Sequence, residues 1–271
     1  MGSVATHPLI ASRYRLDDEA LIAWARNQMH TEGVCVLADF VTPAGVRQMV
    51  EECAHLAPLA HRSAPHRNPY LTVSSNVSSN VSANVSANVS STSAAVLYDS
   101  LEVLAYDQLP TSGSLRTLYE SNEMLHFIRR CLGLAELFHY GDPLGALNVS
   151  IMRDGDMLDW HFDMTDFVVS IALQSAEHGG DFENAPMVRV AGEQVISALL
   201  AGDHTRVRVE PMKAGTLMLF NGRQSMHRVS PIVGATPRYM ALLAYDTKAG
   251  TNSTDELKLS RYGRLPERRE V

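Results

Sequence analysis

A histidine and an aspartate lie two positions apart in the segment Trp160-His161-Phe162-Asp163. Residues i and i+2 of a β-strand point to the same face, so His161 and Asp163 can reach one metal ion while Phe162 points away. Imidazole nitrogen and carboxylate oxygen are common metal ligands. The pair alone is weak evidence, because an ion pair at a strand end would give the same pattern.

His227 and Arg238 complete a more specific pattern. His227 follows the apolar run GTLMLF, and Arg238 lies eleven residues later, after the turn residues VGATP. Two histidines and one carboxylate on a β scaffold form the facial triad of non-haem iron sites, which leaves coordination positions open. An arginine beside that metal is a fixed, bidentate partner for the distal carboxylate of a 2-oxo acid. We therefore predict a metal bound by His161, Asp163 and His227, with Arg238 as the anchor of a co-substrate.

The wider motifs resemble a known family. The segments HFDMTDFVVSIALQ, GGDFEN, GRQSMHRVSP, RYMALLAYDT and SRYG are similar to those of Fe(II)/2-oxoglutarate-dependent oxygenases, in particular the free-amino-acid radical halogenases and their hydroxylase relatives. The resemblance covers residues 148–263. It implies a mainly β fold with a double-stranded β-helix (jelly-roll) core and flanking helices. It also implies Fe(II) on the triad, 2-oxoglutarate on Arg238, and O2 as the second co-substrate.

Asp163 decides between the two reactions of that subgroup. The halogenases open a chloride site by carrying Gly or Ala in place of the carboxylate, whereas this chain keeps Asp163. The expected activity is therefore hydroxylation of an unactivated C–H bond in a small molecule, a free amino acid or related metabolite. The alternatives are halogenation, a non-redox Zn or Mn enzyme of similar fold, and a binding module without activity. Desaturation and ring closure begin with the same hydrogen abstraction and also stay open.

One departure from the family concerns the co-substrate. Many oxygenases carry Ser two residues after the arginine, where this chain has Met240. Asn148, on the strand before the His-x-Asp segment, is our candidate for the missing hydrogen bond to 2-oxoglutarate. The alternative for Asn148 is a strand-edge amide bound to the backbone.

Residues near the triad are candidates for substrate contact. They are Trp160, Met164, Asp166 and Arg223. The alternatives are packing on the barrel wall for Trp160 and a surface ion pair for Arg223. Met164, Leu242 and Ala244 are apolar at positions where lysine-type relatives are expected to carry polar side chains. A substrate with a charged terminus at those positions is therefore not expected.

The elements that position these residues fall into two parts. Periodicity and capping residues predict helices over 17–30, 42–56 and 114–132, a strand over 34–40, and a loop over 57–69. From residue 144 onward, short β-branched runs with turn residues between them indicate an antiparallel sandwich or barrel. We expect one oxygenase domain over 1–271. It would have mainly helical support with one strand over 1–140, the jelly-roll core over 141–263, and a tail over 264–271.

A four-residue repeat of the form NVSS or NVSA occupies residues 76–91. Asn and Ser are poor helix formers, and period four does not match a strand. We predict a flexible loop near the entrance of the site. The alternative is a low-complexity insertion without a role.

Composition limits the class of protein. The 271 residues are 45% hydrophobic and 20% charged, with a net charge of −7, which fits a globular protein and not one specialised for duplex nucleic acid. The basic cluster over 261–269 is interpreted as a solvated tail.

Three cysteines without regular spacing predict buried free thiols. With neither a signal-peptide pattern nor a membrane-length apolar run, we expect a cytoplasmic protein. Its expected partner is a small-molecule substrate, not nucleic acid or membrane, and its oligomeric state stays open.

Overall fold

The computed structural model describes residues 7–63 and 100–267. The predicted loop over 76–91 lies outside these ranges. The helices are α1 (Glu19–Thr31), α2 (Pro43–Leu56), α3 (Ser114–Glu120), α4 (Asn122–Cys131), α5 (Val188–Ala191), α6 (Glu193–Leu200) and α7 (Asp255–Tyr262), with short 3-10 turns at Ala57–Leu59 and Tyr106–Gln108.

The strands divide between two main sheets and two small ribbons. Within the described residues, a seven-stranded sheet has the order β1-β11-β7-β14-β5-β3-β2 and a four-stranded sheet the order β10-β9-β12-β6. The first comprises β1 (Val34–Leu37), β2 (His61–Ser63), β3 (Leu101–Leu104), β5 (Leu147–Met152), β7 (Val168–Gln174), β11 (Leu217–Phe220) and β14 (Arg238–Leu243). The second comprises β6 (Leu158–His161), β9 (Phe182–Ala185), β10 (Arg208–Glu210) and β12 (Met226–Val229). The ribbons pair β8 (His178–Gly179) with β13 (Ile232–Val233), and β4 (Phe138–His139) with β15 (Tyr245–Asp246).

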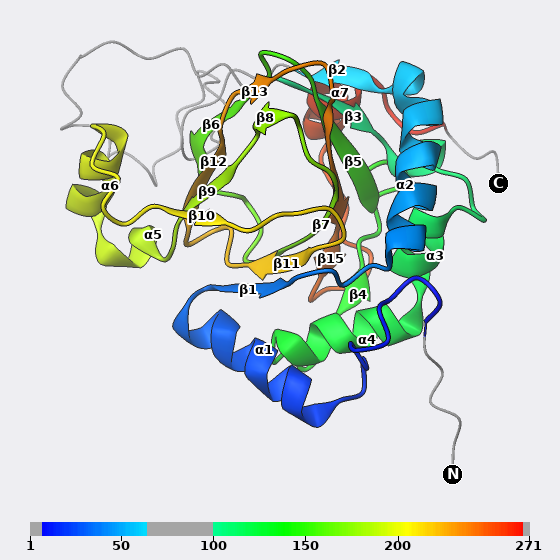
Figure 1. Cartoon of the computed structure of the whole chain (residues 1–271), viewed down its shortest axis with the longest axis horizontal. Coiled ribbons are helices and arrows are strands. Elements are labelled where there is room, and N and C mark those ends of the chain that lie inside the picture. Colours follow the sequence, from blue (N-terminus) through cyan, green and yellow to red (C-terminus); the bar gives the residue numbers. More distant parts are fainter. Residues whose placement is uncertain (1–6, 64–99, 268–271) are drawn as a thin grey trace.

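The two main sheets enclose the interior, and α1 to α4 cover the outer face of the larger one (Figure 1). All pairings in both sheets are antiparallel. This arrangement confirms the predicted mainly β fold with flanking helices and a jelly-roll core.

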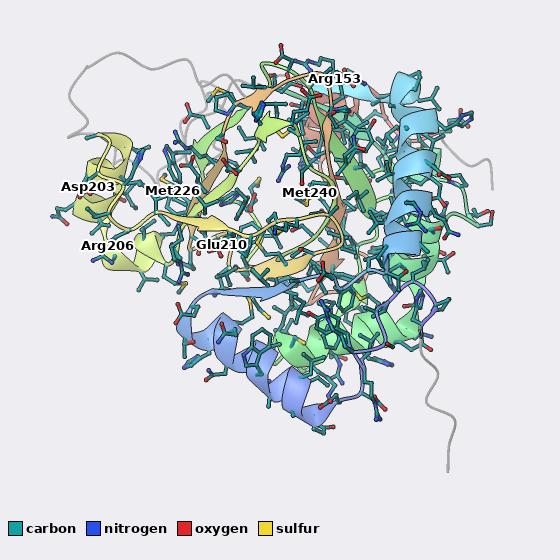
Figure 2. All side chains as sticks on the ribbon, viewed as in Figure 1. Arg153, Asp203, Arg206, Glu210, Met226 and Met240 are labelled. Carbon is teal, nitrogen blue, oxygen red and sulfur yellow. The ribbon has the colours of Figure 1, made fainter. Side chains whose placement is uncertain are left out.

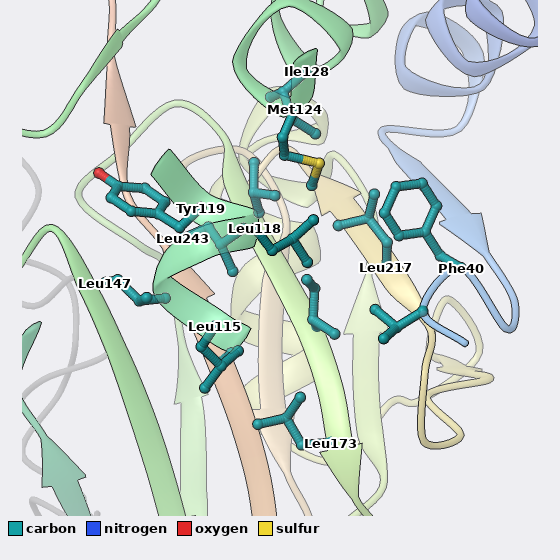
Figure 3. Packing of buried hydrophobic residues seen from close by; sticks show 14 of the residues in the cluster. Phe40, Leu115, Leu118, Tyr119, Met124, Ile128, Leu147, Leu173, Leu217 and Leu243 are labelled. Atoms are coloured by element: carbon teal, nitrogen blue, oxygen red, sulfur yellow. The ribbon is translucent and has the colours of Figure 1, made fainter. Parts of the chain in front are cut away.

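The strand β14 shows how alternation separates the core from the interior of the barrel. Tyr239 and Ala241 belong to the hydrophobic cluster under the helices, whereas Arg238, Met240 and Leu242 line the cavity between the sheets. Successive side chains of a strand point to opposite faces, so one segment serves both surfaces. Figure 3 shows the helical side of this packing, where Leu243 and Leu147 of the sheet meet Leu115, Leu118, Tyr119 and Met124 of the helices.

The N-terminal part contributes more strands than the sequence predicted. One strand was expected before residue 141, but β2, β3 and β4 join β1 there, and β2 and β3 extend the seven-stranded sheet at the β5 edge. The predicted loop over 57–69 is therefore wrong at His61–Ser63, which pairs with β3. Its sequence, HRS, has no hydrophobic alternation, so the partner strand and not the local pattern determines its conformation. The larger sheet contains strands from both sides of residue 141. The change in sequence composition at that residue therefore does not coincide with a boundary of the sheet.

The expected helix over 114–132 is two helices that meet at Ser121. Its backbone is extended (φ −69°, ψ 134°), and its hydroxyl accepts a hydrogen bond from the Met124 amide at 3.2 Å, which caps α4. The same hydroxyl lies 3.1 Å from the Leu118 carbonyl oxygen of α3 and donates to it. One side chain thus satisfies backbone groups of both helix ends.

Two further expectations have clear outcomes. Cys35, Cys53 and Cys131 are buried and free, as predicted, and burial raises the pKa of each thiol to about 12. The interpretation of 261–269 as a solvated tail is wrong for its first part. Arg261 belongs to α7, and Arg264 forms a two-bond ion pair with Asp107.

None of the helices in the described part of the chain has the length and apolarity that a membrane span requires.

Replacement of Ser121 tests the junction between α3 and α4. We expect Ser121→Ala to lower the free energy of unfolding by about 1 kcal/mol, because the amide of Met124 loses its cap. Ser121→Thr keeps a hydroxyl and serves as the control. Urea unfolding followed by circular dichroism measures both, and equal stability of the alanine variant and the native protein would contradict the assignment.

Candidate metal and co-substrate site

A cavity of about 310 Å³ lies between the two main sheets. Its walls come from both sheets and from α7, and the three predicted metal ligands and Arg238 all line it. Met240 points into the same space (Figure 2). The cavity thus brings together the four residues on which the sequence prediction rested.

Pairing of β6 with β12 sets the two histidines side by side. His161 and His227 are direct partners in the antiparallel register, and their ring centroids are 4.3 Å apart. Asp163 follows β6, and its backbone N–H donates to the Gly222 carbonyl at 3.0 Å. Its carboxylate oxygens lie 3.2 Å from His227 Nε2 and 4.0 Å from His161 Nε2. One ligand atom from each of the three residues lies within 4.8 Å of the others, as a shared metal ion would require.

Hydrogen bonds to the backbone fix the orientation of both rings. His161 Nδ1 lies 2.6 Å from the Asp159 carbonyl, and His227 Nδ1 lies 3.0 Å from the Ser225 carbonyl. A carbonyl can only accept, so each Nδ1 carries the proton and donates it. The Nε2 atom of each ring is then the nitrogen that faces Asp163. Such backbone contacts are the usual way in which proteins orient histidine ligands for a metal.

The carboxylate of Asp163 is ionised despite its surroundings. Burial raises the pKa of this carboxyl, but the charge and hydrogen bond of His227, with smaller contributions from His161 and Arg261, outweigh burial and lower the pKa to about 2. In turn, burial lowers the pKa of His227, and Asp163 reverses this effect so that the pKa is raised. The donor set is therefore two imidazoles and one anion, which suits Fe(II).

Gly222 leaves room for this carboxylate. A Cβ atom built on Gly222 would lie 2.5 Å from Asp163 Oδ2 and 3.0 Å from Val168 Cγ2. Any larger residue would displace Asp163 from its position between the histidines. The glycine in the segment FNGRQ is thus part of the site, although no local pattern in the sequence singles it out.

Arg238 is a buried cation that lacks a carboxylate partner among the described residues. Its side chain is 6% exposed, and its closest polar contact is Met152 Sδ at 3.9 Å. Burial lowers the pKa of its guanidinium to about 10, and Asp181 offsets only part of that effect. A buried charge is unfavourable unless an opposite charge meets it. An anionic ligand in the cavity would supply that charge.

Two serine hydroxyls line the same cavity. Ser150 is the cross-strand partner of Met240, and Ser170 is the partner of Leu242. Both hydroxyls are buried, and neither has a hydrogen-bond partner within the ranges that the structure describes. Ser150 therefore places a hydroxyl beside Met240, where many oxygenases carry serine on the arginine strand itself.

The structure does not support Asn148 as a ligand of 2-oxoglutarate. Its Nδ2 donates to the Gly145 carbonyl at 3.2 Å and to the Tyr262 hydroxyl at 3.1 Å, while its Oδ1 accepts from Arg261 at 3.1 Å. Both amide hydrogens are thus in use. Asn148 also lies four residues along β5 from Met152, the partner of Arg238, which corresponds to about 13 Å of strand.

Of the four candidate substrate residues, one lines the cavity. Met164 does so, with 62% of its side chain exposed at the mouth. The prediction that Trp160 contacts the substrate is wrong. Trp160 is the strand neighbour of His161 and points to the opposite face, where it packs against His204 and Arg228.

Asp166 and Arg223 are also wrong as residues of the cavity. They form an exposed ion pair with each other, and neither appears among the lining residues. The sequence suggested them because they are close in number to Asp163 and His227. Their side chains are exposed instead, although Thr165 and Phe167 on either side of Asp166 line the cavity.

Sequence reasoning missed the contribution of α7. This helix presents Leu257, Arg261 and Tyr262 to the cavity. A signal was present: Thr254 caps the helix, and Asp255 and Glu256 occupy its first turn, which is a typical helix start. The high charge of the following tail concealed it.

Comparison with solved structures identifies the class of fold. A 2OG-Fe(II) oxygenase family oxidoreductase from Burkholderia pseudomallei is 16% identical, with a TM-score of 0.53 over 87% of this chain and 95% of that one. The α-ketoglutarate-dependent epimerase SnoN from nogalamycin biosynthesis is 12% identical, with a TM-score of 0.58 over 84% and 83%. A prolyl-4-hydroxylase from Pseudomonas putida is 13% identical, with a TM-score of 0.50 over 82% and 97%. The fold is that of the Fe(II)/2-oxoglutarate-dependent oxygenases, as the sequence predicted.

The family is more specific than the fold. A family model described as Halogenase D matches residues 99–259, so the chain belongs to the Halogenase D family. No curated protein matches the sequence. The predicted resemblance to halogenases and oxygenases is thus confirmed, while the expected free-amino-acid substrate stays a prediction.

The triad assignment makes a direct prediction about metal binding. His161→Ala and His227→Ala should each abolish retention of Fe(II), because two remaining ligands hold a labile ion poorly. His178→Ala, an exposed histidine of β8 outside the cavity, should bind iron like the native protein. Metal analysis after anaerobic loading and desalting measures the content, and full occupancy in either triad variant would refute the assignment.

Proposed function

We propose that the protein is a 2-oxoglutarate-dependent non-haem iron dioxygenase that hydroxylates an unactivated C–H bond of a small molecule. The substrate we expect is a free amino acid or a related metabolite. One observation carries the proposal: an ionised carboxylate, Asp163, lies beside both imidazoles of a cavity that also holds the buried cation Arg238. A hydrolytic Zn or Mn site would give Arg238 no evident role.

The three ligands would hold Fe(II) through His161 Nε2, His227 Nε2 and a carboxylate oxygen of Asp163. A second structure of the epimerase SnoN is a complex with Fe3+ and α-ketoglutarate, which supports the same pair of cofactors here. When bound, iron and 2-oxoglutarate together activate O2 and supply the oxidant that breaks the substrate C–H bond. The protein's own share is to orient the reactants and to exclude water from the cavity.

Arg238 would bind the distal carboxylate of 2-oxoglutarate. Its guanidinium is buried against Met152 Sδ, and its Cδ would lie 3.0 Å from a Cβ built on Gly180, so close packing limits the reordering that a bidentate contact would need. We assign the additional hydrogen bond to Ser150 instead of Asn148. The Ser150 hydroxyl is buried in the cavity, lies on the strand next to Arg238, and has no other partner in the described part of the chain.

Asp163 favours hydroxylation over halogenation even though the chain belongs to the Halogenase D family. A halide would need the coordination position that the carboxylate fills. It would also have to approach the negative charge that Asp163 carries as a metal ligand. The position that distinguishes the two reactions thus carries the ligand of a hydroxylase.

Replacement of Arg238 tests the co-substrate assignment. Arg238→Ala should raise the KM for 2-oxoglutarate about 10- to 100-fold, because a charge-assisted hydrogen-bonded contact contributes about 1.5–3 kcal/mol. Ser150→Ala should raise it less, in line with about 1 kcal/mol for a neutral hydrogen bond. Arg153→Ala, an exposed arginine next to Met152 that pairs with Glu102, is the control. Succinate formation measures all three, and an unchanged KM in the Arg238 variant would point to another anchor.

The product distinguishes the two reactions. With Fe(II), ascorbate, 2-oxoglutarate and excess chloride, a substrate panel should yield product that gains oxygen and not chlorine, as read by mass spectrometry. In Asp163→Gly we expect hydroxylation to be largely lost and chlorination to be weak or absent, since the pocket does not place the substrate for halogen transfer.

The matched control is Asp166→Gly, the same change at an exposed carboxylate outside the cavity. It should hydroxylate like the native protein. Chlorinated product from the native protein would overturn the assignment of Asp163.

A further inference from the structure

A second guanidinium reaches the cavity from α7. This helix packs against β2 and β3 (Figure 1). Buried Lys258 secures it by donating to the Ser253 carbonyl at 2.8 Å and by lying 4.0 Å from buried Asp142. Arg261, one turn further along the helix, lines the cavity. Because these contacts of Lys258 hold the helix in place, Arg261 presents its positive charge to the cavity from a fixed position.

Asn148 orients this guanidinium. One terminal nitrogen of Arg261 donates to Asn148 Oδ1 at 3.1 Å, and the amide of Asn148 is itself held by Gly145 and Tyr262. The Nε atom of Arg261 is buried and has no hydrogen-bond partner within 7–63 and 100–267. Nor do those residues place a carboxylate within ion-pair distance of Arg261. The side chain is thus held in position with a buried donor unsatisfied, which is unfavourable unless a ligand accepts from it.

Arg238 and Arg261 are held at different places along β5. Arg238 contacts Met152 and Arg261 contacts Asn148, and these partners are four residues apart on β5. Four residues of strand span about 13 Å. A 2-oxoglutarate molecule with its distal carboxylate on Arg238 would therefore leave Arg261, held by Asn148 at the other position, available for a second anionic group.

The charges around the cavity indicate what is missing. Asp163 is the one carboxylate among the lining residues of the described chain. Fe(II), Asp163, Arg238 and doubly charged 2-oxoglutarate sum to zero, so Arg261 leaves one positive charge uncompensated. Near Arg261 the cavity is lined by Leu242, the cross-strand partner of Asn148, and by Leu257, one turn earlier on α7, together with the hydroxyl-bearing Tyr262. The space suits one anionic group on an apolar body, because the described lining residues include no second acid that would receive a cationic group.

We propose that Arg261, positioned by Asn148, binds the carboxylate of the substrate, and that the substrate is a small carboxylic acid with an apolar body. The proposal rests on the proposed function, since it presumes that Arg238 holds 2-oxoglutarate. It narrows the substrate class to acids whose remaining part carries no cationic group, such as an aliphatic carboxylic acid.

Matched acid and amide probes test this assignment. Calorimetry on the anaerobic protein loaded with Fe(II) and 2-oxoglutarate would measure binding of 4-methylpentanoate against 4-methylpentanamide, and of L-leucine against L-leucinamide, with L-lysine as the cationic comparison. We expect at least one acid to bind about 10- to 100-fold more tightly than its amide, as for a charge-assisted contact. Lysine should bind more weakly than leucine.

Variants separate recognition from a structural role. Arg261→Gln should remove the preference for acid over amide while the affinity for 2-oxoglutarate stays unchanged, and Arg261→Lys should restore part of the preference. Arg264→Gln, a nearby arginine paired with Asp107, should behave like the native protein. If Arg261 is only structural, its loss will weaken acid, amide and 2-oxoglutarate alike.

The outcomes also separate this inference from the proposed function. Loss of 2-oxoglutarate binding in the native protein would refute the function itself. Normal 2-oxoglutarate binding with equal affinity for acid and amide, or with no carboxylate bound at all, would refute the role of Arg261 alone.

Discussion

The antiparallel register between β6 and β12 is the constraint on which the site depends. It sets His161 directly opposite His227, and a slip of one residue would turn one imidazole to the far face of the sheet. Pairing of His227 with Asn184 of β9 holds β12 from the other side. Asp163 then needs only one backbone hydrogen bond to Gly222 to bring its carboxylate to the two rings. Three ligands thus follow from one strand pairing and one close turn.

Charge is distributed unevenly around this centre. The anion Asp163 has two histidine neighbours, whereas the buried guanidinium of Arg238 and the half-buried guanidinium of Arg261 lack carboxylate partners in the described ranges. Arg238 is buried in the larger sheet, so its guanidinium has little access to water. A protein that maintains unpaired cations in a cavity is stabilised when anions enter it.

The sequence predicted the parts of the site that follow from local rules. Period-two alternation placed His161 and Asp163 on one face, and the run of short strands indicated the jelly roll. The same alternation also excludes Trp160, since it is the strand neighbour of His161. Ser150 and Arg261 could not be found in this way. The role of Ser150 depends on which residue lies across from Met240, and that of Arg261 depends on where a C-terminal helix packs. Both are consequences of tertiary pairing that spacing along the chain does not encode.

The edge formed by β2 and β3 has a consequence for how related chains can diverge. Ser63 and Leu101 are paired across these strands, and both line the cavity, so the intervening segment, which contains the NVSS and NVSA units, starts and finishes at adjacent points. The entropy of closing such a connection grows only with the logarithm of its length. Adding or removing one four-residue unit would change that cost by about 0.1 kcal/mol. The number of units can therefore drift in evolution while the walls beside the iron ligands stay where they are.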